Sequence, residues 1–137
     1  MRTGLRAAVA ISALAASLTA GGALANGGGR LSGSSWMVTG VGEFSVEPAD
    51  GVTIEFSAGQ IAGRSGCNRY TGPVAISADR VTIGPVAGTR MACLGRPMEI
   101  ERSFLAALET ITRWRIAEGG ALELLAEDAL LIRAVGP

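Results

Sequence analysis

The clearest hydrophobic pattern in the chain lies in "VTIEFSA", residues 52–58, where apolar and polar side chains alternate. Val52, Ile54 and Phe56 are apolar, and each residue between them is polar. Successive side chains of a strand point to opposite faces. The alternation therefore predicts a strand with one face buried in a core and the other in water.

Four other segments in the first half have the composition of strands. "SWMVTGV" (35–41) is a first strand, and "GQIAGRSG" (59–66) pairs back on residues 52–58, where Gly63 indicates a bulge or a close backbone approach. "GPVAISA" (72–78) and "RVTIGPV" (80–86) form a further hairpin around Asp79. Its predicted inward residues are Val74, Ile76, Val81 and Ile83.

The apolar period changes at Pro97, which suits the first position of a helix. A single amphipathic helix is predicted from there to about Thr112, with Glu99 and Glu101 complementing the dipole at its N-terminus. The predicted apolar stripe consists of Met98, Leu105, Leu108 and Ile111, with Phe104 alongside.

Three short apolar runs follow the helix, "RWRIAE" (113–118), "ALELLAE" (121–127) and "ALLIRAV" (129–135). Turn residues separate them, so they predict a meander of strands. Strands, one helix and strands again indicate an α+β fold. We expect a strongly curved antiparallel sheet, or a cracked, partly open barrel, packed by the single helix.

The N-terminus has the pattern of a secretory signal peptide over residues 1–25. Arg2 and Arg6 precede the apolar stretch 7–20, and Ala23-Leu24-Ala25 is a small-x-small cleavage site. The apolar stretch is shorter than the roughly 20 residues that span a bilayer. "NGGGRLSGSS" (26–35) is predicted to be a flexible lead-in to one folded domain, residues 36–137.

These features predict a periplasmic or secreted protein. The first cysteine is Cys67, so no cysteine near the cleavage site can carry a lipid, and we expect no stable membrane anchor. Removal of the leader's two arginines leaves 10 basic against 12 acidic residues, a net charge of about −2. That balance lacks the basic footprint of a nucleic-acid-binding protein.

The chain contains neither histidine nor lysine. Their absence excludes Ser-His-Asp and Cys-His catalysis, histidine-ligated metals and lysine Schiff bases. No nucleotide-binding loop is convincing either, because "GVGEFS" lacks the third glycine of that motif. We expect no cofactor and no metal.

Three motifs carry a family resemblance: "SGCNRYTGPVAI", "VTIGPVAGTRMAC" and "MEIERSFLAAL". In this order they resemble the META domain of the HslJ-like heat-shock proteins, and the resemblance extends from Trp36 onward. It implies a bent sheet packed by one helix and a role in stress tolerance, with no agreed catalytic activity. The residues that match the motifs, and that we expect to be structural, are Gly66, Tyr70, Gly72, Thr89, Met91 and Glu101.

Cys67 and Cys93 are the only cysteines. In an exported protein they are expected to form a structural disulfide. The alternative is a reactive thiol, although no histidine is present to lower its pKa and no Cys-x-x-Cys motif occurs.

Arg64, Asn68, Arg69 and Arg90 form a candidate site for an anion or a partner, because arginine suits bidentate contacts to carboxylate or phosphate. The structural alternative places Asn68 in a left-handed or side-chain-bonded turn. In that alternative Arg69 and Arg90 pair with carboxylates such as Glu101.

The helix carboxylates offer weaker chemistry. Glu99 and Glu101 are two residues apart and diverge on a helix, so they and Glu109 are not expected to act in acid-base catalysis. Glu101 and Arg102 are expected to serve in caps and ion pairs instead. The large aromatic residues could line an apolar pocket, but the core is their expected place. These are Trp36, Tyr70, Phe104 and Trp114.

The sequence therefore predicts a non-enzymatic, monomeric binding domain. Its expected partner is an envelope protein or an amphiphile of unspecified identity. One alternative is a carrier of lipids or small hydrophobic molecules, and another is an enzyme that uses Cys67 or the carboxylates.

Overall fold

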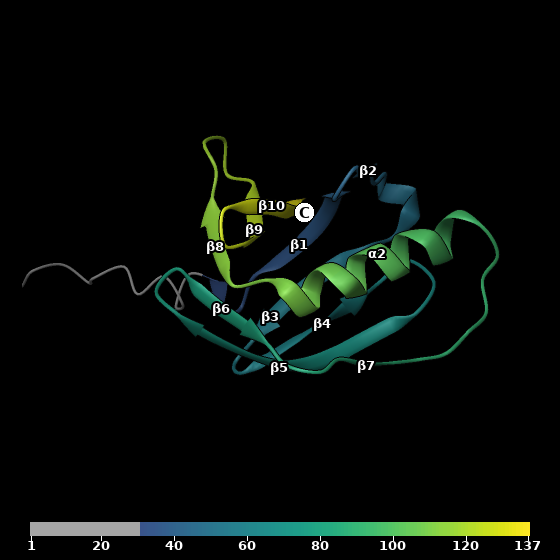
Figure 1. Ribbon diagram of the computed structural model, residues 1–137, viewed down its shortest axis with the longest axis horizontal. Coiled ribbons are helices and arrows are strands. Elements are labelled where there is room, and N and C mark those ends of the chain that lie inside the picture. Colours follow the sequence, from purple (N-terminus) through teal and green to yellow (C-terminus); the bar gives the residue numbers. More distant parts are fainter. Residues whose placement is uncertain (1–30) are drawn as a thin grey trace, which may run out of the picture.

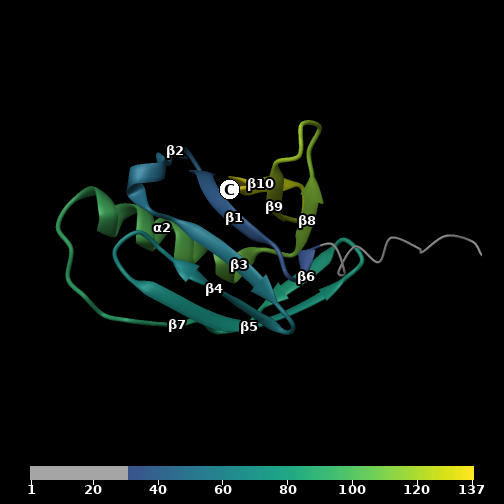
Figure 2. The ribbon, with the colours of Figure 1, turned by 180° about the vertical axis from the view of Figure 1, so that it is seen from behind.

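The computed structural model describes residues 31–137 (Figures 1 and 2). The predicted signal peptide and the first five residues of the predicted lead-in lie outside this range. The elements are β1 (Ser35–Val41), β2 (Phe44–Ser45), a 3₁₀ turn (Pro48–Asp50), β3 (Thr53–Ser57), β4 (Gln60–Arg64), β5 (Arg69–Ser77), β6 (Arg80–Ile83), β7 (Ala87–Gly88), α2 (Arg96–Thr110), β8 (Arg113–Ile116), β9 (Leu122–Ala126) and β10 (Ala129–Val135).

Eight of these strands form a closed antiparallel barrel in the order β1-β3-β4-β5-β6-β8-β9-β10. The last strand, β10, pairs with β9 on one side and with β1 on the other, from Met37↔Val135 to Val41↔Ile132. The α+β class is confirmed, but the predicted cracked barrel is wrong. Alternating patterns specify the buried face of each strand, whereas closure depends on the pairing of the two ends of the domain, which no local pattern encodes.

The narrowest seam of the barrel lies between β6 and β8. Only Arg80 and Arg113 pair there in register. Backbone bonds on either side extend the contact, from Val81 N–H to the Thr112 carbonyl and from Trp114 N–H to the Asp79 carbonyl, both 3.0 Å long.

Helix α2 crosses the barrel and contacts β1 and β10 (Figures 1 and 2). Its most deeply buried apolar residues are Ile100, Phe104 and Leu108. The predicted stripe is therefore only partly correct, because Met98 and Leu105 are half-buried at its side and Ile100 was not included in it. Glu101, the residue after Ile100, is buried as well. The buried face of the helix therefore consists of Ile100, Glu101, Phe104 and Leu108.

The folded domain begins earlier than the predicted Trp36. Leu31 is only 1% exposed and belongs to the core. Gly33 N–H donates to the Phe56 carbonyl at 2.6 Å, and Phe56 N–H donates to the Ser34 carbonyl at 2.9 Å. Residues 31–35 are thus held against β3. This corrects the prediction that these five residues belong to a flexible lead-in.

The alternation of residues 52–58 is confirmed, since Val52, Ile54 and Phe56 are all buried. Gly63 marks a close approach rather than a bulge, because the β4–β5 register runs through it without a shift. A Cβ at Gly63 would lie 2.2 Å from the Thr53 carbonyl oxygen, a distance that only glycine permits.

The aromatic residues fill the core rather than an open pocket. Tyr70, Phe104 and Trp114 are buried, and Trp36 is half-buried against the core. Tyr70 and Phe104 meet edge to face with ring centroids 5.3 Å apart. In the described part of the chain, no helix is long and apolar enough to cross a membrane.

Candidate functional site

The β4–β5 loop, residues 65–68, packs on the first turns of α2. Ser65 N–H donates to the Asn68 carbonyl at 2.8 Å and closes the loop. Gly66 has φ +123°, and a Cβ there would lie 2.7 Å from the Pro97 carbonyl oxygen. Glycine is therefore required at this position both by conformation and by the closeness of the helix.

Glu101 projects from α2 into this loop and is 5% exposed. Its Oε1 accepts hydrogen bonds from Ser65 Oγ at 2.5 Å and from Asn68 N–H at 2.7 Å, and its Oε2 accepts one from Asn68 Nδ2 at 2.9 Å. Burial raises the pKa of Glu101, but these bonds and the Cys67 amide favour the charged form and bring the pKa below its ordinary value. Glu101 is thus a buried carboxylate held by neutral donors.

Asn68 connects the loop to the segment after β7. Its Oδ1 accepts from Met91 N–H at 2.7 Å and from Thr89 Oγ1 at 3.0 Å, and its Nδ2 also donates to the Met91 carbonyl at 3.2 Å. Asn68 is absent from the residues with positive φ, so it is bonded through its side chain and not left-handed. With its amide engaged, Asn68 cannot take part in the predicted anion site.

Cys67 and Cys93 form the predicted disulfide, with their Cα atoms 6.0 Å apart. The bond fixes the same two segments that Asn68 joins. We call this cluster the polar junction; it consists of Ser65, the disulfide, Asn68, the backbone of Met91, and Glu101.

The three predicted arginines lie outside the polar junction. Arg64 and Arg69 oppose each other across β4 and β5, and Arg90 follows Thr89, whose N–H donates to the Arg69 carbonyl at 3.0 Å. All three are exposed, and none forms an ion pair with a described residue. The expected pairing with Glu101 is wrong, because neutral donors already occupy both carboxylate oxygens.

Glycine and tyrosine of the matched motifs have structural roles. A Cβ at Gly72 would lie 2.7 Å from Val86 Cγ1, so glycine lets the chain after β6 cross β5. Tyr70 Oη donates to the Thr53 carbonyl at 2.8 Å, and burial raises the pKa of its phenol.

A groove of about 510 Å³ separates α2 from the extended segment 86–92. We call it the segment groove. Arg90 and Met91 lie on one side, and Met98, Glu101 and Leu105 lie on the helix side. Met91, one of its apolar lining residues, reaches solvent and is 59% exposed.

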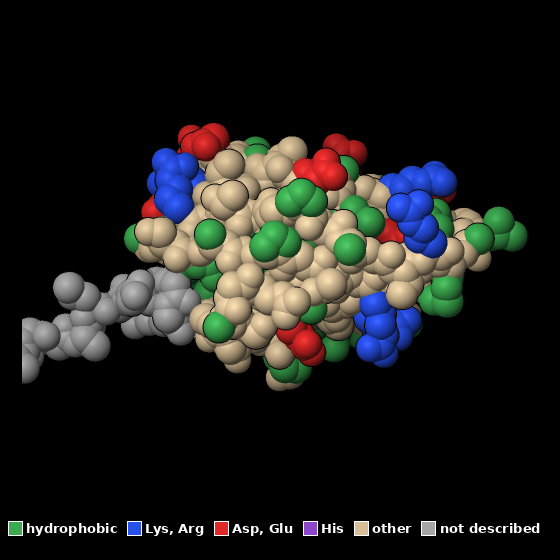
Figure 3. Space-filling model, turned by 90° about the horizontal axis from the view of Figure 1, so that it is seen from below, with side chains coloured by type: hydrophobic (Ala, Val, Ile, Leu, Met, Phe, Trp, Pro, Cys, Tyr) green, Lys and Arg blue, Asp and Glu red, His purple; other side chains and the backbone are tan. Residues whose placement is uncertain are grey.

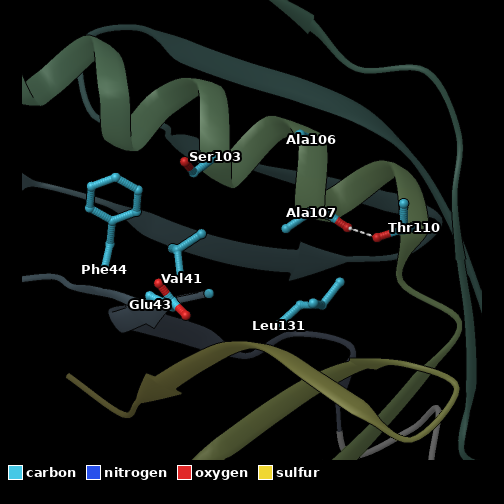
Figure 4. Close-up of a pocket in the computed structure, with 9 residues that line it drawn as sticks. Val41, Glu43, Phe44, Ser103, Ala106, Ala107, Thr110 and Leu131 are labelled. Carbon is cyan, nitrogen blue, oxygen red and sulfur yellow. Dashed lines mark hydrogen bonds between the residues drawn. The ribbon is translucent and has the colours of Figure 1, made fainter.

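A second groove of about 440 Å³ lies on the other side of α2, and we call it the hairpin groove. Figure 4 shows Phe44, Val41 and Leu131 facing Ala106 and Ala107 of the helix. Its lining is largely apolar, with Glu43, Ser103 and Thr110 at the edges.

In Figure 3 the basic side chains lie toward the two ends of the face, whereas acidic side chains also occur between the ends, along the upper and lower margins. Among residues 31–137, no group of three or more cysteine and acidic side chains is placed to hold a metal ion.

The role of Glu101 was missed by sequence reasoning, although the sequence held a signal. Glu101 is three residues after Met98 and four before Leu105, so it lies within the predicted apolar stripe. A charged residue there requires a buried partner. Ser65, its hydroxyl donor, had no comparable signal.

Comparisons with known proteins agree with this architecture. The family model described as the META domain matches residues 29–135. An NMR structure of a protein from Burkholderia xenovorans is similar, with 26% identity, a TM-score of 0.66, and coverage of 80% of this chain and 85% of that chain. A second NMR structure shares the fold at 22% identity and a TM-score of 0.62, covering 78% and 92%. No curated protein matches the chain.

Proposed function

The chain belongs to the META domain family, and we propose that it is an exported, non-enzymatic domain that supports envelope or heat-stress tolerance by binding a protein or an amphiphile. The observation that carries the binding role is the segment groove. The disulfide and Asn68 hold residues 89–93 in place beside α2, with Arg90 and Met91 exposed.

Export is supported by two independent features. The sequence pattern of residues 1–25 is that of a signal peptide, and Cys67 and Cys93 form a disulfide. Disulfides persist mainly in oxidising compartments outside the cytosol. We therefore assign the domain to the periplasm or the medium.

The chemistry of the polar junction supports binding rather than catalysis. Cys67 is bonded to Cys93, so it offers no thiolate. Both oxygens of Glu101 accept hydrogen bonds from the loop, and these bonds favour its charged form. An enzyme built on these residues has no support in this arrangement.

Complementation of a deletion strain tests the proposal. We expect the wild-type chain to restore survival of heat or envelope stress, and Arg90→Glu/Met91→Glu to fail although its melting temperature is unchanged. Arg80→Glu, at the opposite end of the barrel, is the matched control and should complement. Full complementation by the Arg90→Glu/Met91→Glu chain would contradict a binding role for the segment groove.

The hairpin groove favours a second candidate, a carrier of small hydrophobic molecules. Its apolar walls and volume of about 440 Å³ suit a single small ligand. Native mass spectrometry of the exported protein should then detect a copurifying apolar molecule, and Ala106→Trp should displace it by filling the groove. Protein that is always empty would count against this candidate.

A further inference from the structure

Strand β7 pairs with β5 along one edge only. In an antiparallel ladder, alternate residues direct their backbone groups to opposite edges. Thr89 N–H donates to the Arg69 carbonyl, and Met91 is held by Asn68 on the same side. The N–H and carbonyl groups of Gly88 and Arg90 therefore point away from β5, and no described residue hydrogen-bonds to them.

This open edge is fixed in place rather than covered. Unpaired strand edges are sites where another strand can add, and proteins usually close or block them. The eight barrel strands are closed upon each other, whereas Asn68 and the disulfide hold Met91 and Cys93 against the β4–β5 loop. Figure 1 shows the chain after β7 as a long connection that leads to the start of α2.

The opposite wall of the segment groove is apolar. Met98 and Leu105 are seven residues apart on α2 and face the groove on the same side of the helix. Glu101 lies between them but is 5% exposed, and its oxygens are occupied by Ser65 and Asn68. A strand laid along the groove would therefore meet apolar contacts on its helix side.

One arginine lies at the open edge itself. Arg90 lines the segment groove, is exposed, and forms no ion pair among residues 31–137. Arg69 lies on the neighbouring strand β5 and is also exposed, whereas Arg64 lies on β4, on the far side of β5 from β7. A partner segment with carboxylates would supply the negative counter-charge for these exposed guanidinium groups.

We propose that the segment groove binds an extended acidic peptide segment of a partner protein, which adds as a strand to the open edge at Gly88 and Arg90. Alternate side chains of the peptide pack on Met98 and Leu105, and one of its carboxylates pairs with Arg90. This inference rests on the proposed binding function and specifies the class of partner for the same groove.

The test uses the full-length exported protein and a pool of fluorescent peptides of about seven residues, with Val or Ile alternating with Glu or Asp. We expect binding with a Kd below about 100 μM. Arg90→Glu should weaken it by about tenfold or more, whereas the control Arg80→Glu should change it by less than about twofold.

N-methylated peptides test the geometry of binding. Methylation of alternate amides in one phase removes the donors that reach the edge, so it should abolish binding, and methylation in the other phase should leave most of it. The amide protons of Gly88 and Arg90 should become protected from hydrogen exchange when peptide is added.

Three results would overturn the inference. They are no binding by any member of the pool at about 1 mM, equal loss of binding in both methylation phases, or self-association through the same edge in place of peptide binding.

A fluorescent fatty acid is measured in parallel. If it alone binds and Arg90→Glu abolishes that binding, peptide recognition fails while the proposed binding function stands; if neither probe binds and the groove variants complement fully, both fail.

Discussion

Two buried glutamates of this domain are held in opposite ways. Glu101 on α2 is surrounded by neutral donors from Ser65 and Asn68. Glu123 on β9 is bound by two arginines instead, with Arg115 Nε at 2.7 Å and Arg133 Nη1 at 3.3 Å. Their exposed fractions are nearly equal, 5% and 6%, so burial alone does not distinguish them.

The difference lies in what each carboxylate connects. Glu123 links strands β8, β9 and β10, whose register is already set by their own backbone pairing. Glu101 links α2 to a loop 33 to 36 residues earlier in the chain, and that loop shares no strand pairing with the helix. A buried charge that replaces missing backbone pairing should therefore matter more to stability than one that supplements it.

The disulfide is expected to have the largest effect. Cys67→Ala/Cys93→Ala removes a link across a sequence separation of 26. In the chain-entropy account its loss costs about 3.5 kcal/mol of the free energy of unfolding. Urea denaturation of the oxidised wild type and the variant measures the difference. A loss below about 1 kcal/mol would show that the hydrogen bonds of Asn68 alone organise the polar junction.

Glu101→Ala should have the next largest effect. It removes the buried acceptor of both Asn68 donors, while the Ser65 hydroxyl keeps the Asn68 carbonyl as an acceptor at 2.9 Å. We expect a loss of about 2 kcal/mol, because each buried donor without a partner costs about 1 kcal/mol or more. The measurement is the urea midpoint, with Glu99→Ala on the exposed side of the same helix as the control.

Glu123→Ala should cost only about 1 kcal/mol, since the side chains of Arg115 and Arg133 are 60% and 49% exposed and water can replace the carboxylate. The same denaturation series gives this value. The comparison between the two glutamates fails if Glu123→Ala destabilises the domain as much as Glu101→Ala.

The smallest effect is a dependence on pH. The pKa of folded Glu101 lies below its ordinary value of 4.5, so its charged form stabilises the fold above that pH. This stabilisation is lost as the pH falls through the lower, folded pKa. The stability difference between wild type and Glu101→Gln should therefore shrink as the pH falls from 6 to 3, measured by urea denaturation at each pH. A difference that stays constant over this range would contradict the assigned charge of Glu101.

Local patterns predicted most of the elements and one covalent link. The alternation of Val52, Ile54 and Phe56, the helix after Pro97, and the Cys67–Cys93 bond all follow from neighbouring residues or from the number of cysteines. The META domain was also identified from its motifs and is matched by the family model.

The remaining features depend on contacts between distant segments. Leu31 was assigned to a flexible lead-in because glycine and serine surround it, yet its own side chain is buried in the core. Glu101 was assigned to caps and ion pairs because exposed glutamate is the common case, and only the fold brings Ser65 and Asn68 to it. Closure of the barrel between β1 and β10 likewise has no local signature.

The pairing of β1 with β10 also has a consequence for biosynthesis. The first barrel strand pairs early with β3 but receives its second neighbour only when β10 has been made, so the barrel cannot close before the last of its strands has been synthesised. Pairing between such distant segments is slow as well, because the chain must first lose the entropy of a long loop. The unfinished barrel is therefore open along one edge of β1, and the domain cannot reach its closed form before β10 is added.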